Sequence, residues 1–140
     1  MSAGSGQCWH WDSYVAKNDL WWQFGRFAQA VKGIDPPAEQ FRPVRFEHPR
    51  LRVYALAGRN TLLAWCRDTQ NTWETELAEG KAPELLKGLS ITLPPDCIPT
   101  PPGKVRCYDP WTGAWSDSKV EGGRLSLSPF TRSVVVRVER

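Results

Sequence analysis

The chain has 140 residues and a formal net charge of +3, and its basic residues do not gather into a long run. One domain of this length can bury a core without disulfides or a structural metal, and the charge pattern gives no indication of nucleic-acid binding. No apolar run reaches the roughly 20 residues that a transmembrane helix needs. Twelve prolines and eleven glycines favour short strands and many turns over a helical bundle.

The cysteines and the N-terminal residues carry little functional information. The four cysteines show no CxxC motif and no spacing typical of a metal site, and they allow three disulfide pairings; they are Cys8, Cys66, Cys97 and Cys107. Buried free thiols are the favoured interpretation, and a Cys66–Cys107 bridge stays open as the alternative. Residues 1–7 lack the basic and apolar segments of a signal peptide. We expect no metal and no cofactor.

Residues 6–33 hold four of the eight tryptophans. Residues 8–15 predict a short strand that ends in an aromatic, polar mouth. Residues 18–32 predict one amphipathic helix, which Asn18 or Asp19 can cap at its start and Gly33 can end in the left-handed conformation. A single strand and a single helix do not make a domain, so residues 1–35 are interpreted as one unit of a larger α/β structure.

The predicted helix has a wide apolar side that needs a large partner surface. Its association face is formed by Leu20, Phe24, Phe27 and Val31. If the chain stands alone, exposed apolar patches of that size usually associate. We therefore expect the helix to fold back on the rest of the chain or to mediate a homodimer.

After the helix, the pattern changes from helical spacing to alternation. Residues 36–50 are rich in proline and predict a connector, pinned by Phe41, Val44 and Phe46. Residues 51–57 and 60–67 predict a β-hairpin. Further strands are expected near 89–93, 105–107, 125–127 and 134–138. The polar segment 68–88 is expected to be anchored by Trp73 and to include a helical turn at 83–87. Residues 51–140 thus predict an antiparallel β-sandwich of about six to eight strands.

The two halves together resemble a known arrangement. The segments GQCWHWDSYV and NDLWWQFGRFAQAVKGID resemble the last strand and last helix of the (β/α)₈ barrel in clan A glycoside hydrolases. The second half resembles the β-sandwich that follows the barrel in such enzymes. That likeness rests on residues 61–65 (TLLAW), 105–108 (VRCY) and above all 109–113 (DPWTG). Some relatives have been labelled collagen-binding or carbohydrate-binding, and a parent of this kind would be secreted or periplasmic.

The resemblance implies a non-catalytic chain. Retaining glycosidases need two carboxylates roughly 5–5.5 Å apart, and in clan A enzymes these lie at the ends of the fourth and seventh barrel strands, which this chain lacks. We therefore expect no catalytic residues and no enzymatic activity from the chain itself. The eighth strand of the family offers a tryptophan that stacks on the sugar, and Trp9 and Trp11 are the matching positions. His10 and Asp12 between them are interpreted as structural, since no nucleophile is near.

These observations predict a non-catalytic accessory sandwich that docks on a barrel and stabilises it. The first alternative is a carbohydrate-binding module, and the second is a relic or repurposed stand-alone interaction domain. Candidate polysaccharide contacts are Trp9, Trp11, Trp73, Trp111 and Trp115. Each of them has a competing interpretation as packing, because aromatic side chains commonly cover interfaces. The expected partners are a barrel domain, a polysaccharide or a second copy, with no nucleic acid and no membrane.

Overall fold

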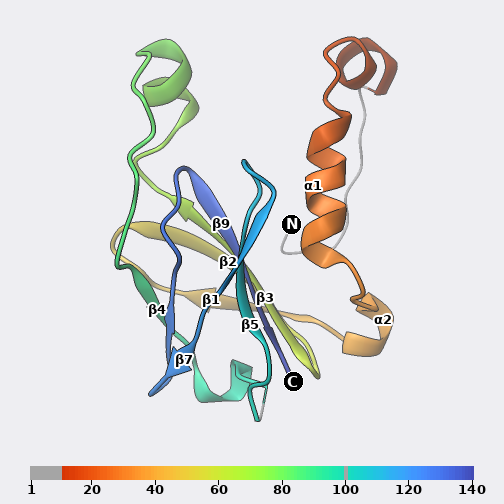
Figure 1. Cartoon of the computed structure of the whole chain (residues 1–140), viewed down its shortest axis with the longest axis vertical. Coiled ribbons are helices and arrows are strands. Elements are labelled where there is room, and N and C mark those ends of the chain that lie inside the picture. The colour runs from red at the N-terminus through yellow and green to blue at the C-terminus, as the bar shows by residue number, and fades with distance from the viewer. Residues whose placement is uncertain (1–10, 100) are drawn as a thin grey trace.

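The computed structural model describes residues 11–99 and 101–140, with side chains from residue 14 onward. It contains two antiparallel sheets, one of six strands in the order β1-β2-β3-β9-β5-β6 and one of three strands in the order β4-β8-β7 (Figure 1). The predicted mainly β, antiparallel sandwich is therefore confirmed. The strands are β1 Arg42–Phe46, β2 Leu51–Ala57, β3 Thr61–Asp68, β4 Ser90–Thr92, β5 Val105–Asp109, β6 Ala114–Asp117, β7 Val120–Glu121, β8 Arg124–Ser126 and β9 Ser133–Glu139.

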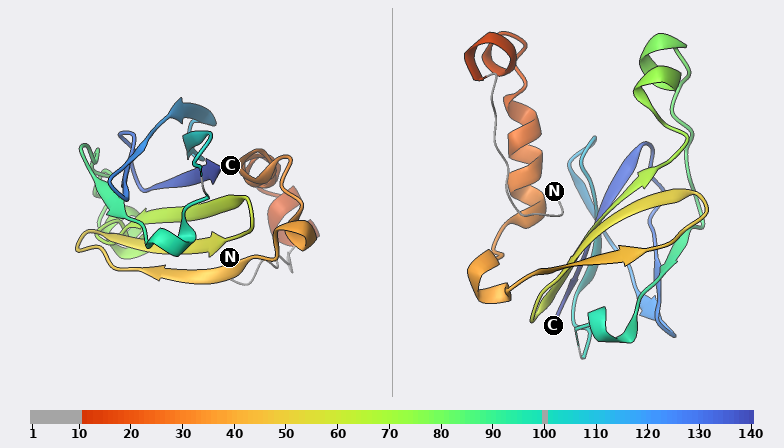
Figure 2. Two further views of the ribbon diagram at one scale, coloured as in Figure 1. Left: turned by 90° about the horizontal axis from the view of Figure 1, so that it is seen from below. Right: turned by 180° about the vertical axis from the view of Figure 1, so that it is seen from behind.

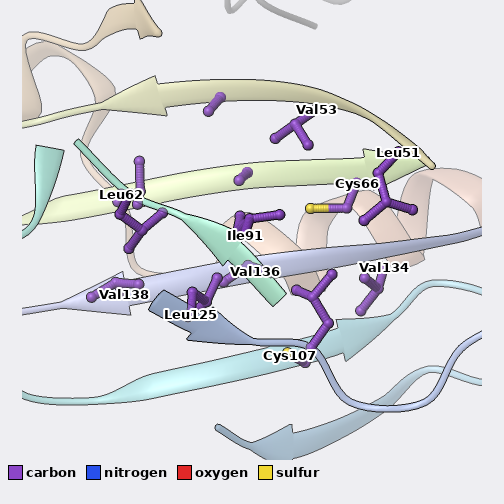
Figure 3. Close-up of a cluster of buried hydrophobic side chains, with 14 of the residues drawn as sticks. Leu51, Val53, Leu62, Cys66, Ile91, Cys107, Leu125, Val134, Val136 and Val138 are labelled. Atoms are coloured by element: carbon purple, nitrogen blue, oxygen red, sulfur yellow. The ribbon is translucent and has the colours of Figure 1, made fainter. Parts of the chain in front are cut away.

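The two sheets enclose one main hydrophobic core (Figure 3). Alternation along β2, β3 and β9 places every second side chain in it. In β3, for example, Leu62, Ala64 and Cys66 point inward, and Val134, Val136 and Val138 do so in β9. The small sheet closes the core from the other side with Ile91 and Leu125. The strand predictions around 89–93, 105–107, 125–127 and 134–138 hold.

The predicted hairpin forms with the predicted turn. Strands β2 and β3 pair antiparallel from Leu51↔Asp68 to Ala57↔Leu62. Gly58 lies where a side chain would collide with Glu39 and Phe41, so this turn has a packing reason for glycine. Its neighbours are held by Glu39, whose carboxylate accepts hydrogen bonds from the backbone N–H groups of Asn60 and Thr61 at 2.8 and 3.1 Å.

The N-terminal strand prediction is wrong where the structure describes it. Residues Trp11–Ala16 form a π-helical turn, and residues 8–10 lie outside the described part. Helix α1 then runs over Trp21–Val31, within the predicted range, and Gly33 adopts the expected positive φ of 78°. The predicted cap is absent: Leu20 occupies the N-cap position, and the Asn18 side chain donates instead to the Tyr14 carbonyl at 2.8 Å.

The predicted connector is also corrected. Residues 36–50 contain the short helix α2, Pro36–Glu39, and strand β1, which pairs with β2 from Arg42↔Ala57 to Phe46↔Val53. Val44 and Phe46 pack against the main core, as expected. Proline is tolerated here because β1 is an edge strand, where Pro43 need not donate to a neighbour. The segment belongs to the sandwich and is not a linker between two units.

In segment 68–88, two predictions are wrong: Trp73 as an anchor and the helical turn at 83–87. Trp73 is 72% exposed and anchors nothing; it precedes a π-helical turn, Glu74–Ala78. Residues 83–87 are extended instead of helical, and the buried Leu86 forms a β-bridge with Phe130. A 3₁₀ turn, Pro95–Cys97, lies in the proline-rich loop that follows β4.

Cys66, Cys97 and Cys107 are buried free thiols, as the sequence favoured. Burial, with a smaller contribution from neighbouring Cys107, raises the pKa of Cys66 to about 12, which makes that thiol a poor nucleophile. Within the described residues no group of His, Cys, Asp or Glu side chains is arranged to hold a metal ion. Nor is any described helix long and apolar enough to cross a membrane.

Candidate binding face on the large sheet

The outer face of the six-stranded sheet, opposite the core, carries many of the sheet's aromatic and arginine side chains. Strand registers place one row of side chains across all six strands. The row consists of Arg45, Tyr54, Trp65, Val135, Tyr108 and Trp115. Four of its six members are aromatic, so this face is unlike a solvated sheet surface, on which polar side chains would alternate with the core residues.

Helix α1 lies on the β9 and β5 side of this face. Ala30 is buried together with Tyr108 and Val135, and Trp65 and Trp115 pack around them. Past the end of α1, the carbonyl of Lys32 accepts a 2.7 Å hydrogen bond from Arg137 Nη1. The guanidinium of Arg26 occupies the space next to Gly113, where a Cβ atom would clash with it. The helix therefore folds back on the sandwich, which is one of its two predicted positions.

The association face of α1 is only partly used by this contact. Leu20 and Val31 are half-buried, while Phe24 and Phe27 are exposed. Trp22 and Phe27 keep 46% and 45% of their surface exposed, and Trp21 is also exposed. The helix contacts the sandwich through Ala30 and Arg26. These two residues lie to one side of the aromatic stripe formed by Phe24 and Phe27.

Trp115 is enclosed by its neighbours. Its ring centroid lies 4.8 Å from that of Tyr108, at an interplanar angle of 39°. The Arg106 guanidinium lies over the same ring, 4.4 Å from its centroid, in a cation–π contact. With two neighbours on its ring, Trp115 offers little free surface to a sugar.

Trp111 is more accessible. It sits in the turn between β5 and β6, where Asp109 Oδ1 accepts the Trp111 backbone N–H at 2.8 Å and Gly113 has a positive φ of 78°. Its indole N–H donates to Ser133 Oγ at 3.2 Å, and the ring is 45% exposed. The Arg132 guanidinium lies 4.7 Å from the ring centroid and forms an ion pair with Glu76.

The five predicted sugar contacts do not form one platform. Trp9 lies outside the described residues, and only the backbone of Trp11 is described. Trp111 and Trp115 share the β5–β6 hairpin, but Trp73 stands by the Glu74–Ala78 turn, on the opposite side of the sandwich from α1 (Figures 1 and 2). A hollow of about 310 Å³ on the small sheet is lined by residues such as Ser90, Glu121 and Arg124, and by none of these tryptophans.

Two pairs of arginines lie directly opposite each other on the outer face. The first pair, Arg106 and Arg137, is bridged by Glu139, whose two oxygens accept at 3.0 Å from Arg106 and at 2.6 Å from Arg137. Burial raises the pKa of Glu139, but the hydrogen bonds from both arginines outweigh it, and the pKa lies below its ordinary value of 4.5. Nearby, Arg106 Nε, Arg137 Nε and Tyr108 Oη are buried without a hydrogen-bond partner among the described residues.

The second pair, Arg52 and Arg67, has no such bridge among the residues that the structure describes. These residues face each other across β2 and β3, and the Arg67 guanidinium donates to the Asn71 carbonyl at 3.2 Å. The adjacent pair, Tyr54 and Trp65, is stacked with ring centroids 5.5 Å apart and an interplanar angle of 26°. Sequence reasoning missed this group. The hairpin register would have placed it, because the predicted turn at residues 58–60 brings Arg52 opposite Arg67.

Comparisons of the chain with models of protein families, with curated proteins and with solved structures each found no match.

Proposed function

We propose that the chain is a non-catalytic accessory β-sandwich of a glycoside hydrolase-like protein and that it docks on a (β/α)₈ barrel through α1. The observation that carries the proposal is the aromatic stripe of α1. Its members Phe24 and Phe27 are 41% and 45% exposed although the helix is already seated on the sheet by Ala30. Trp22, on the other flank of Ala30, is 46% exposed. An amphipathic helix buries its apolar side against a partner. A stripe of this kind left exposed by its own domain marks an interaction surface.

The use of the carboxylates supports an accessory role over a catalytic one. Glu39 holds the β2–β3 turn, and Asp68, which is only 2% exposed, accepts two hydrogen bonds from Arg50 at 2.8 and 3.1 Å. Glu76 pairs with Arg132, and Glu139 bridges Arg106 and Arg137. A pair of acid and nucleophile needs two carboxylates that face a substrate, whereas these four are engaged in holding loops and arginines.

The proposal can be tested on the gene and then on its product. DNA upstream of the Met1 codon, or a neighbouring gene, should encode a barrel with two glutamates at strand ends. In the barrel–sandwich protein, Trp22→Ser and Phe27→Ser should lower the melting temperature of the barrel and increase hydrogen exchange in α1. Trp73→Ser is the matched control, because that aromatic side chain is even more exposed, at 72%, and lies on the far side of the sandwich from α1.

Two outcomes would reject the docking role. One is the absence of any barrel in frame or nearby. The other is a homodimer of this chain that dissociates in Phe27→Ser, as measured by light scattering, which would assign the stripe to a second copy. A glycan role for Trp73, Trp111 and Trp115 together is less well supported. Trp115 is enclosed, and the Trp111 ring is covered on one side by Arg132, which pairs with Glu76 of the turn after Trp73.

A further inference from the structure

The Arg52–Arg67 pair is an electrostatic anomaly on the outer face. Like charges directly opposite each other in antiparallel strands are destabilising, and the other such pair on this face is neutralised by Glu139. No outward position of β1, β2 or β3 holds a carboxylate. Glu47, which follows β1, forms no ion pair with any described residue, and Asp68 points inward to Arg50. The charge of this partly exposed pair is therefore balanced by water and counterions, which an anionic ligand would displace.

An aromatic platform lies in the next row. Tyr54 and Trp65 stack on each other, and Arg45 lies directly opposite Tyr54 on β1. Successive rows are two residues apart along a strand, about 6.6 Å. Arg45 and Arg52 are exposed, because α1 sits over β9 and β5 and leaves the β1 side of the face open. Three guanidinium groups therefore lie around two stacked, half-buried rings. Trp65 also packs against the cluster of Ala30, Tyr108 and Val135, so the accessible part of this surface is its β1 side.

We propose that this surface, formed by Arg45, Arg52, Tyr54, Trp65 and Arg67, binds a polysaccharide that carries carboxylate groups. The planar guanidinium fork of arginine matches a carboxylate with two parallel hydrogen bonds. Because Tyr54 and Trp65 stack, each ring covers one face of the other, so the apolar surface offered to the C–H groups of a sugar is the remaining part of the half-buried Tyr54 ring on the β1 side. A polyuronate presents both features in repeating order, with an acid group and an apolar ring face in each sugar.

The charge distribution favours this ligand over a single-stranded nucleic acid. A nucleic acid carries one phosphate per nucleotide and is bound along a continuous basic track. Here the cations are gathered around two rings, and the net charge of the chain is only +3. The inference is independent of the docking role, since it uses strands β1 to β3 and not the aromatic stripe of α1.

Affinity electrophoresis and calorimetry with polygalacturonate test the proposal directly. We expect binding that weakens with salt and that falls at least about tenfold, or roughly 1.4 kcal/mol, in the Arg52→Gln/Arg67→Gln variant. Methyl-esterified polygalacturonate, which keeps the rings and loses the charges, should bind as weakly as the variant. Arg59→Gln is the matched control, because this exposed arginine bonds to Gln40 in a turn away from the rings.

Urea unfolding of the same variants separates lost binding from lost folding, since replacing both arginines removes their mutual repulsion and should not destabilise the chain. Trp65→Leu supplies a second test through the ring platform. Equal affinity for the acidic and the esterified polymer, no affinity for either, or tighter binding of oligothymidylate would each overturn the proposal. None of these outcomes bears on whether α1 docks on a barrel.

Discussion

The two faces of the six-stranded sheet are made by the same strands and have opposite characters. On the inner face, Leu62, Cys66 and Val136 are almost completely buried beneath the small sheet. On the outer face, Tyr54, Trp65 and Arg67 are only half covered. Trp65 and Arg67 nevertheless flank the buried Cys66 in sequence, and Tyr54 lies between the buried Val53 and Ala55. The inner face supplies the stability that comes from close packing. The outer face keeps partly exposed rings and cations, so it is the face on which binding chemistry can lie.

The largest expected effect comes from a substitution on the inner face. Leu62→Ala should lower the free energy of unfolding by about 2–5 kcal/mol, because it removes a fully buried side chain and leaves a cavity. Leu56→Ala, at a half-buried outer position, should cost about 1 kcal/mol. Urea denaturation of both variants measures the difference. Equal losses would mean that the two faces do not differ as described.

The next effect concerns the charge at the end of β3. Asp68→Asn weakens two charge-assisted hydrogen bonds from Arg50 and should cost about 1.5–3 kcal/mol at neutral pH. Burial raises the pKa of Asp68, but the bonds from Arg50 and the Gln70 amide outweigh it, so the pKa is below its ordinary value of 3.8. A lowered carboxyl pKa stabilises the fold above the unfolded-state value.

The contribution of Asp68 should therefore be complete above about pH 5 and decline as pH falls through 3.8 to the lower folded-state pKa. Thermal unfolding from pH 6 to pH 2 should show a smaller loss for Asp68→Asn than for the wild type. A variant with an unchanged acid response would contradict the assignment.

A smaller effect distinguishes the two arginine pairs. Glu139→Gln removes the negative charge between Arg106 and Arg137 and should destabilise the sheet by about 1–2 kcal/mol. The melting temperature should fall and should recover little with added salt, because Arg137 is only 7% exposed and a buried repulsion is weakly screened. If the variant is as stable as the wild type at low salt, Glu139 does not act as the bridge.

The smallest effect has the opposite sign. Arg52→Gln removes one side of the unbridged pair and should raise stability by about 0.2–1 kcal/mol. Chemical denaturation at low ionic strength, with Arg59→Gln beside it, provides the measurement. A clear loss of stability would show that Arg52 is held by a contact that the described residues do not reveal.

Alternation and helical spacing predicted the sandwich well because its elements obey one dominant rule each. The hairpin at 51–67 and the strand Ser133–Glu139 place apolar residues at every second position, and α1 follows a helical period. The failures lie where local patterns compete. Alternation of aromatic and polar residues at 8–15 predicted a strand, yet residues 11–16 turn as a π-helix. Strand β1 was not predicted because its proline-rich sequence indicated a connector, whereas an edge strand tolerates proline.

The candidate binding face was predicted only in part, since it depends on register. Trp111 and Trp115 stood out as tryptophans beside a turn, but which of their ring faces are covered depends on Arg132, Arg106 and Tyr108. The Arg52–Arg67 pair is separated by 15 positions in the chain and becomes visible only when the strands are aligned. Composition alone could not locate it, because the net charge of the chain is small.

Helix α2 and strand β1 determine where this protein could be divided. Glu39 fastens the segment before β1 to the β2–β3 turn through Asn60 and Thr61, and β1 covers the open edge of β2. A cut at residue 50, between the predicted units, would expose the backbone of Leu51–Ala57 as a bare apolar edge, which is a template for aggregation. A cut at residue 35 would keep that edge paired. A cut that keeps α2 whole and β1 paired with β2 therefore has to come before Pro36.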